Sequence, residues 1–225
     1  MLRDRIPELV FATIFLFSGL GCCGVAVMRR RGQMQLLVWL GIWSTIEGVR
    51  PLIGSLAEIG LLPRWFQVTL PYQDIISSYL VIVIAALAFL QPSQGELRLF
   101  FQGAVFVGLA VALAGIGFFL FAGLPYKMMP YNHVVAACAV AVLATVVAVP
   151  GLSRKFLILP DRGVVAVCIF LFAIEALYGN LSGPLGLWNP PNILDPLGFA
   201  ILLFSVGYAA VQQSKTRSLQ PARGF

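Results

Sequence analysis

The sequence has little charge and almost no histidine. Charged residues make up 11% of the 225 residues, hydrophobic residues make up 60%, and His133 is the single histidine. An average soluble domain has roughly 25% charged residues and about 45–50% apolar residues. A chain of this composition cannot cover its apolar side chains with a polar surface in water. The composition therefore excludes an ordinary soluble domain and indicates an integral membrane protein.

Cysteine is also scarce, and its placement excludes two further classes of protein. Cys22, Cys23, Cys138 and Cys168 all lie within apolar stretches, so a disulfide framework of the secreted type is not expected. One histidine without cysteines at metal-ligand spacing does not make a zinc or haem site. His133 follows Asn132 at the start of an apolar run and is interpreted as an interfacial residue. We expect no metal, no cofactor and no catalytic site, and therefore no enzyme in this chain.

The formal net charge of +6 does not indicate a nucleic-acid partner. The basic residues lie in the segments between apolar runs and do not form a basic face on a polar helix. In a membrane protein such residues determine which side of the bilayer a loop occupies.

Seven apolar runs follow one another, separated by proline-rich and glycine-rich breakers. A membrane-spanning helix needs about 20 mostly apolar residues. The runs are Leu9 to Met28, Leu36 to Ile59, Tyr72 to Leu90, Leu99 to Ala122, Val134 to Val149, Gly163 to Asn180 and Leu197 to Gln212. We predict an all-α, polytopic bundle of seven transmembrane helices over residues 1–212, followed by a short basic cytoplasmic tail at 213–225.

The distribution of lysine and arginine predicts the orientation of this bundle. Under the seven-helix interpretation, ten of these residues lie on one side and four on the other, and cytoplasmic loops carry the excess. The ten are Arg29, Arg30, Arg31, Arg98, Arg154, Lys155, Arg162, Lys215, Arg217 and Arg223, and the four are Arg3, Arg5, Arg64 and Lys127. The N-terminus is thus predicted outside and the C-terminus in the cytoplasm, in a multi-pass protein of a cell inner membrane.

Two further patterns fit a helical membrane bundle. Aromatic residues, including Trp65, Tyr72 and Trp188, occur where the chain is predicted to leave the bilayer on the outer side. Small residues recur at a spacing of four, as in Gly108 and Ala112, which allows neighbouring helix backbones to approach closely.

Three ionisable residues interrupt apolar runs. Glu47 and Arg50 share a face of the second run, and Glu175 lies in the sixth. At 1.5 Å per residue, both glutamates lie roughly 18 Å from the cytoplasmic surface. Charges at such depth are costly and are usually paired or functional. Because two acids and one arginine leave a net negative charge, we expect either a protonated glutamate or an additional donor.

Other polar residues are predicted at the same depth and complete a polar layer. The candidate ligand-binding residues of this layer are Glu47, Arg50, Tyr79, Glu175, Tyr178 and Asn180, with Ser77, Ser78, Trp43, Asp74 and Asp195 as further candidate donors or rim residues. The layer has two interpretations. It forms a small pocket that opens outward, or Arg50 simply joins helices through buried hydrogen bonds.

Two segments resemble bacterial seven-transmembrane sensor modules. One is the approach to the last run, Asp195-Pro-Leu-Gly-Phe199, and the other is the segment from Trp43 to Leu52, which contains Glu47, Arg50 and Pro51. In that group the module usually precedes a PPM-type serine phosphatase, a histidine kinase or a diguanylate cyclase. The resemblance implies a seven-helix sensor that signals to a cytoplasmic effector, although this chain carries no recognisable effector domain.

The sequence thus favours a sensory or signal-transduction module that detects a small ligand or a membrane state and passes a helix shift to a cytoplasmic effector or partner. Two alternatives stay open: a small transporter or permease that uses the same polar layer, and a structural or assembly subunit of a membrane complex. The expected partners are the lipid bilayer, a membrane or cytoplasmic protein, and a second copy of the chain in a homo-oligomer.

Overall fold

A computed structural model of the chain describes residues 2–29, 35–91, 93–149, 162–185, 196–205 and 207–208. The described residues contain helices and no strands, which confirms the all-α prediction. The helices are α1 (Leu2–Arg29), α2 (Gln35–Glu58), α3 (Arg64–Leu90), α4 (Gly95–Ala122), α5 (Met129–Ala148), α7 (Arg162–Leu185) and a shorter one at Pro196–Ser205, called the C-terminal helix below.

Six of these helices, α1 to α5 and α7, are long and apolar enough to cross a membrane. Their outer faces carry large exposed hydrophobic side chains, such as Phe17, Phe106 and Phe121. In lipid this exposure carries no penalty, and a helix satisfies all its backbone hydrogen bonds internally. The chain is therefore a helical membrane bundle. The described part of the C-terminal helix is too short to test the seventh crossing. Several residues used in the sequence analysis lie outside the described residues: Trp188, Asp195, the tail at 213–225, and most of the ten basic residues predicted on the cytoplasmic side.

Several helices begin before the apolar runs predicted from the sequence, and two of these starts involve proline. The predicted third run begins at Tyr72, directly after Pro71, but α3 begins at Arg64 and runs through this proline. Proline is tolerated in membrane helices where neighbouring groups satisfy the freed carbonyl. Helix α5 begins at Met129 rather than Val134, with Pro130 in its first turn, where the missing N–H has no intrahelical partner to lose. Asn132 and His133 are consequently helical residues.

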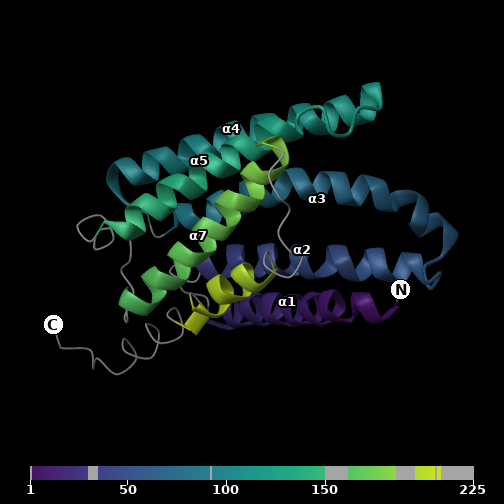
Figure 1. Cartoon of the computed structure of the whole chain (residues 1–225), viewed down its shortest axis with the longest axis horizontal. Coiled ribbons are helices and arrows are strands. Elements are labelled where there is room, and N and C mark those ends of the chain that lie inside the picture. The colour runs from purple at the N-terminus through teal and green to yellow at the C-terminus, as the bar shows by residue number, and fades with distance from the viewer. Residues whose placement is uncertain are drawn as a thin grey trace.

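Helices α1 to α5 alternate in direction, and α3 lies between the closely packed α1–α2 pair and α4 (Figure 1). Helices α1 and α2 make the lower pair in this view, and α4 and α5 lie at the top. Helix α3 contacts both α2 and α4, while α7 crosses obliquely and packs against α5. Helices α1, α3 and α5 all begin at the same end of the bundle, which is called the α1-start end below.

Glycines bring α1 and α2 into backbone contact. A Cβ on Gly41 would lie 2.8 Å from the carbonyl oxygen of Gly19, and one on Gly48 would lie 2.6 Å from that of Ala12. Ser44 Oγ, fully buried between the helices, donates a hydrogen bond of 2.7 Å to the carbonyl oxygen of Phe15. In lipid, helices associate through close packing of small residues and through interhelical hydrogen bonds. The hydrophobic effect does not drive this association, because lipid tails are as apolar as the helix side chains.

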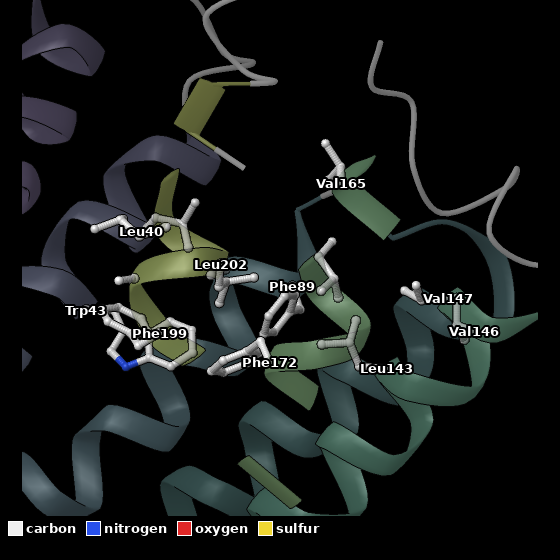
Figure 2. Packing of buried hydrophobic residues seen from close by; sticks show 14 of the residues in the cluster. Leu40, Trp43, Phe89, Leu143, Val146, Val147, Val165, Phe172, Phe199 and Leu202 are labelled. Carbon is white, nitrogen blue, oxygen red and sulfur yellow. The ribbon is translucent and has the colours of Figure 1, made fainter. Parts of the chain in front are cut away.

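Aromatic rings form the centre of the core, where the C-terminal helix meets α2, α3 and α7 (Figure 2). Trp43 lies 4.7 Å from Phe199, 5.8 Å from Phe172 and 6.3 Å from Phe89, measured between ring centroids. The last two contacts are edge-to-face, the geometry that aromatic quadrupoles favour. Trp43 thus links the C-terminal helix to the rest of the bundle.

Candidate functional site

A cavity of about 1050 Å³ lies among α1, α2, α3, α5, α7 and the C-terminal helix. The lining of the cavity begins toward the α1-start end, at Pro7 of α1, Asp74 of α3 and Met129 of α5. It continues along the same three helices, to the middle of α1 and as far as Phe89 in the last turn of α3. The other helices contribute Trp43 to Pro51 of α2, Phe172 to Asn180 of α7, and Pro196 and Phe199 of the C-terminal helix. The volume is at the upper limit of the roughly 300–1,000 Å³ typical of small-molecule pockets.

Arg50 is held across the helix interface at one wall of the cavity. Its Nη2 and Nε donate to Oδ1 of Asp74 at 2.9 and 3.2 Å, and Nη2 also donates to Oγ of Ser78 at 2.9 Å. Ser78 in turn donates to the carbonyl oxygen of Asp74. The ion pair is partly open, because the two side chains keep 31% and 54% of their surface accessible. Arg50 therefore joins α2 to α3, with Asp74 in the role expected for Glu47.

The two glutamates that interrupt apolar runs, Glu47 and Glu175, both line the cavity. Glu47 comes from α2, one turn before Arg50, and Glu175 comes from α7. The carboxylate of Glu175 lies so close to the backbone of Gly198 that a Cβ there would be 2.6 Å from Oε2. A larger residue at position 198 would force the flexible end of the Glu175 side chain to move, because the carboxylate lies directly against the C-terminal helix.

The remaining polar wall joins α5 to α3 and α7. Asn132 Nδ2 donates to the carbonyl oxygen of Ser78 at 3.2 Å, and His133 Nδ1 lies 3.0 Å from Oδ1 of Asn180. Asn180 Nδ2 donates to the carbonyl oxygen of Ala176, which fixes the orientation of its amide. In this arrangement His133 Nδ1 carries the proton, because Oδ1 can only accept.

Two polar atoms of cavity residues have no hydrogen-bond partner within the described part of the chain. They are the indole Nε1 of Trp43 and the amide Oδ1 of Asn132. Trp43 is 6% exposed and Asn132 is 1% exposed, so surface water does not satisfy either atom. Because a buried unsatisfied polar group costs about 1–3 kcal/mol, native structures rarely leave one without a ligand or water. One atom is a donor and the other an acceptor.

The rest of the lining is apolar and rich in aromatic rings. Its aromatic residues are Phe11, Phe15, Trp43, Phe89, Tyr126, Phe172 and Phe199. An apolar chamber with a few convergent polar groups is the usual form of a site for a small organic molecule.

The structure brings together four of the six predicted site residues. Glu47, Arg50, Glu175 and Asn180 all line the cavity, whereas Tyr178 is half-buried on α7 and is not among the described lining residues.

Tyr79 is the clearest difference from the predicted layer. Its fully buried ring packs against Gly115 of α4 in a cluster with Ile75 and Ala112, and its hydroxyl donates to the carbonyl oxygen of Pro125 at 2.9 Å. It faces away from the cavity because it lies one residue beyond Ser78, and adjacent helical positions point about 100° apart.

Sequence reasoning interpreted His133 as an interfacial residue and did not single out Asn132. The signal that identifies them is the proline at the start of α5, because Pro130 is tolerated in a first helical turn and places both residues inside the helix. Asp74 was a candidate donor or rim residue, and its pairing with Arg50 depends on how α2 and α3 are rotated against each other.

Among the described residues, no three histidine, cysteine, aspartate or glutamate side chains cluster as a metal site would. Comparison of the chain with protein-family models, with curated proteins and with solved structures found no match.

Proposed function

We propose that this chain is a membrane sensory module in which the occupancy of the cavity controls the position of the C-terminal helix. The observation that carries the proposal is the contact of the C-terminal helix with the cavity. Pro196 and Phe199 line it, and Gly198 lies against the Glu175 carboxylate. A molecule that enters therefore displaces or braces this helix directly, and the helix leads toward the opposite end of the bundle.

The proposed orientation places the charged residues of the cavity in the outer half of a bacterial inner membrane, with seven crossings and the N-terminus outside. Exposed Trp65, Tyr72, Tyr126 and Tyr131 lie at the α1-start end, as an interfacial aromatic belt requires. A ligand then enters from outside, and the C-terminal helix carries the change to a cytoplasmic effector or partner.

The physical basis is a shift between two helix arrangements. A ligand changes their populations only if it binds one of them more tightly. Phe199, which packs on Trp43 at 4.7 Å, and Gly198, which touches Glu175, are the contacts that differ when the C-terminal helix moves. Shifts of about 1–2 Å at helix interfaces are typical of such transitions.

The proposal is tested by measuring whether the C-terminal helix has two positions. Spin labels are placed at two exposed residues away from the α1-start end, Leu99 of α4 and Phe204 of the C-terminal helix, in a variant whose native cysteines are replaced by alanine. Gly198→Val places a larger side chain against the Glu175 carboxylate. We expect two distance populations between the labels, with the ratio changed by Gly198→Val and a separation of about 2 Å or more.

The matched control is Gly117→Val in α4, where an added side chain meets no neighbouring atom. A single distance population that is the same in all three proteins would overturn the proposed coupling. Uptake of a solute by reconstituted vesicles, lost on substitution of Glu47 or Glu175, would instead assign the cavity to transport, and a stoichiometric partner recovered from native membranes would assign the chain to a complex.

A further inference from the structure

Polar and apolar residues occupy separate parts of the cavity lining. Beyond Ser78 of α3, every described lining residue of that helix is apolar, as far as Phe89. Beyond His133 of α5, the same is true as far as Leu143. Both helices begin at the α1-start end, so a polar section lies toward that end and an apolar section follows it. On the opposite wall, formed by α2 and α7, the apolar section is shorter, because a glutamate lies within about one turn of its deep end.

The apolar section is long enough to hold an alkyl chain. Ser78 and Phe89 are eleven residues apart, and His133 and Leu143 are ten residues apart. At 1.5 Å per residue, the apolar walls of α3 and α5 extend for about 15–17 Å. A staggered chain of single bonds advances about 1.2 Å per bond, so a chain of about 12–14 carbon atoms spans this length.

The deep end of the apolar section is closed by the core. Trp43, Phe89 and Leu143 lie there in one cluster (Figure 2). Ile169 and Leu202, about one turn deeper in their helices than the lining residues, are fully buried in the same cluster. A chain longer than the section must therefore bend or displace packed side chains.

The order of the two sections matches the order of groups in a lipid leaflet. Exposed Trp65, Tyr126 and Tyr131 mark the membrane interface at the α1-start end, and the polar section lies nearer to this interface than the apolar one. A leaflet amphiphile also has its head group at the interface and its chain directed inward. It can thus occupy the cavity without turning over, and its head group is never buried in hydrocarbon. The cavity is not enclosed, so its occupant can exchange with the surroundings.

Resting on the proposed function, in which the cavity holds the ligand of a sensor, we propose that this ligand is a single-chain amphiphile of the outer leaflet. Its head group bears hydroxyls and lies at the level of Ser78, His133 and Asn180, because hydroxyl, imidazole and amide side chains both donate and accept hydrogen bonds, as a hydroxyl does. Its alkyl chain lies along α3 and α5 and ends beside Trp43. Phe199 of the C-terminal helix packs on this indole at 4.7 Å, so the end of the chain bears on the helix that moves.

Trp43 reports on the occupant of the deep end. Bromine quenches indole fluorescence on contact, and Trp43 is only 6% exposed, so a brominated lipid outside the bundle does not reach it. The protein carries Trp43 as its single tryptophan, with Trp39, Trp65 and Trp188 replaced by phenylalanine. Terminally brominated dodecanoyl glycerol is added to this protein in nanodiscs of zwitterionic lipid. We expect quenching that saturates as the mole fraction of the probe in the membrane rises.

Chain length is then tested by competition with unbrominated octanoyl, dodecanoyl and hexadecanoyl glycerol at equal mole fractions in the membrane. We expect dodecanoyl glycerol to displace the probe about tenfold better than either of the others, because a short chain leaves the deep end empty and a long one overpacks it. Glycerol alone, which has the head group and no chain, should displace nothing.

A larger side chain partway along the apolar section should shorten the preferred chain. Ala139 lines the cavity six residues beyond His133, which is about 9 Å, so Ala139→Leu leaves room for about eight carbon atoms. We expect this variant to bind dodecanoyl glycerol about tenfold more weakly and to prefer octanoyl glycerol. Ala85→Leu does the same from α3. Ala110→Leu is the matched control, since Ala110 is exposed on α4 and is not among the lining residues.

Quenching without saturation, equal displacement by the three chain lengths, or displacement by glycerol alone would each overturn the amphiphile assignment. So would an unchanged chain-length preference in both Ala139→Leu and Ala85→Leu, or the same change in Ala110→Leu. These outcomes leave the sensory proposal standing, because the distance populations between Leu99 and Phe204 are measured without added ligand.

Discussion

Single residues of this bundle owe their roles to the direction in which they point from their helices. Tyr79 and Ser78 are adjacent in α3, yet Ser78 lines the cavity and Tyr79 is buried against α4. The role of Arg50 likewise depends on its partner, Asp74. The side chains of Arg50 and Asp74 are 31% and 54% exposed, so their ion pair is partly hydrated. Its net contribution to stability is accordingly modest, and its position is what matters.

Removing the Arg50–Asp74 pair is expected to cost little stability. Because both side chains are partly solvated, a double-mutant cycle with Arg50→Gln and Asp74→Asn should give a coupling free energy of about 1 kcal/mol or less. The measurement is reversible unfolding in mixed micelles. A coupling of about 3 kcal/mol or more would mean that the pair is fully desolvated and that the cavity is closed at this wall.

Tyr79→Phe separates a structural tyrosine from a ligand-binding one. The variant loses the hydrogen bond to the carbonyl oxygen of Pro125 and should be destabilised by about 0.5–1.5 kcal/mol, with unchanged binding of every cavity ligand. Tyr72→Phe is the control, because Tyr72 is exposed and packs on Phe119 through its ring alone. Weakened binding of a cavity ligand in Tyr79→Phe would return this residue to the site.

At the scale of helices, α1 and α2 form the tightest unit of the bundle. Gly19, Gly41 and Gly48 allow the backbones to touch, and Ser44 bonds across the contact. The rigid pair supplies Glu47, Arg50 and Trp43 to the cavity. The C-terminal helix meets the cavity through Pro196 and Phe199, and its Gly198 lies against the Glu175 side chain. It is the element that moves in the proposed function.

Filling the α1–α2 contact should destabilise the bundle strongly. Gly48→Leu places a side chain where a Cβ already lies 2.6 Å from the Ala12 carbonyl oxygen, so overpacking should cost about 1–3 kcal/mol. Gly54→Leu, in the same helix but with no neighbouring atom in reach, is the control and should change the unfolding free energy little. Equal stability of the two variants would contradict the backbone contact.

For the whole molecule, the alternation of helix direction decides which residues meet. The charged residues of the cavity lining, which are Glu47, Arg50, Asp74 and Glu175, lie in the halves of their helices nearer the α1-start end, and the aromatic belt lies at that end too. If neighbouring helices cross the membrane in opposite directions, these charged residues share one leaflet. The proposed site therefore depends on the topology of the entire chain.

Reporter tags test that topology. A tag inserted after Arg31 is expected in the cytoplasm, and one inserted between Gly183 and Pro196 is expected outside, because α2 to α7 and the predicted crossings between them place these points on opposite sides. Alkaline phosphatase and green fluorescent protein fusions report the two compartments. Detection of both tags in the same compartment would remove the shared leaflet and with it the outward-facing cavity.

Much of the fold follows from local properties of the sequence. Long apolar runs become helices because the backbone in lipid must bond to itself, and their positions are readable from hydropathy and breakers. The charges at Glu47, Arg50 and Glu175 are conspicuous for the same reason, because so few polar residues interrupt these runs. These features require no knowledge of which helix lies beside which.

The choice of partners was decided only by the tertiary structure. Whether Arg50 meets Glu47 or Asp74, and whether Tyr79 or Asn132 faces the cavity, depends on the rotation of each helix about its axis and on contacts between distant segments. Hydropathy is nearly the same all around a membrane helix, since lipid and protein interior are both apolar, so the sequence carries a weak signal for that rotation. In the folded bundle, close packing at Gly41, Gly48 and Gly198 sets the rotation of their helices.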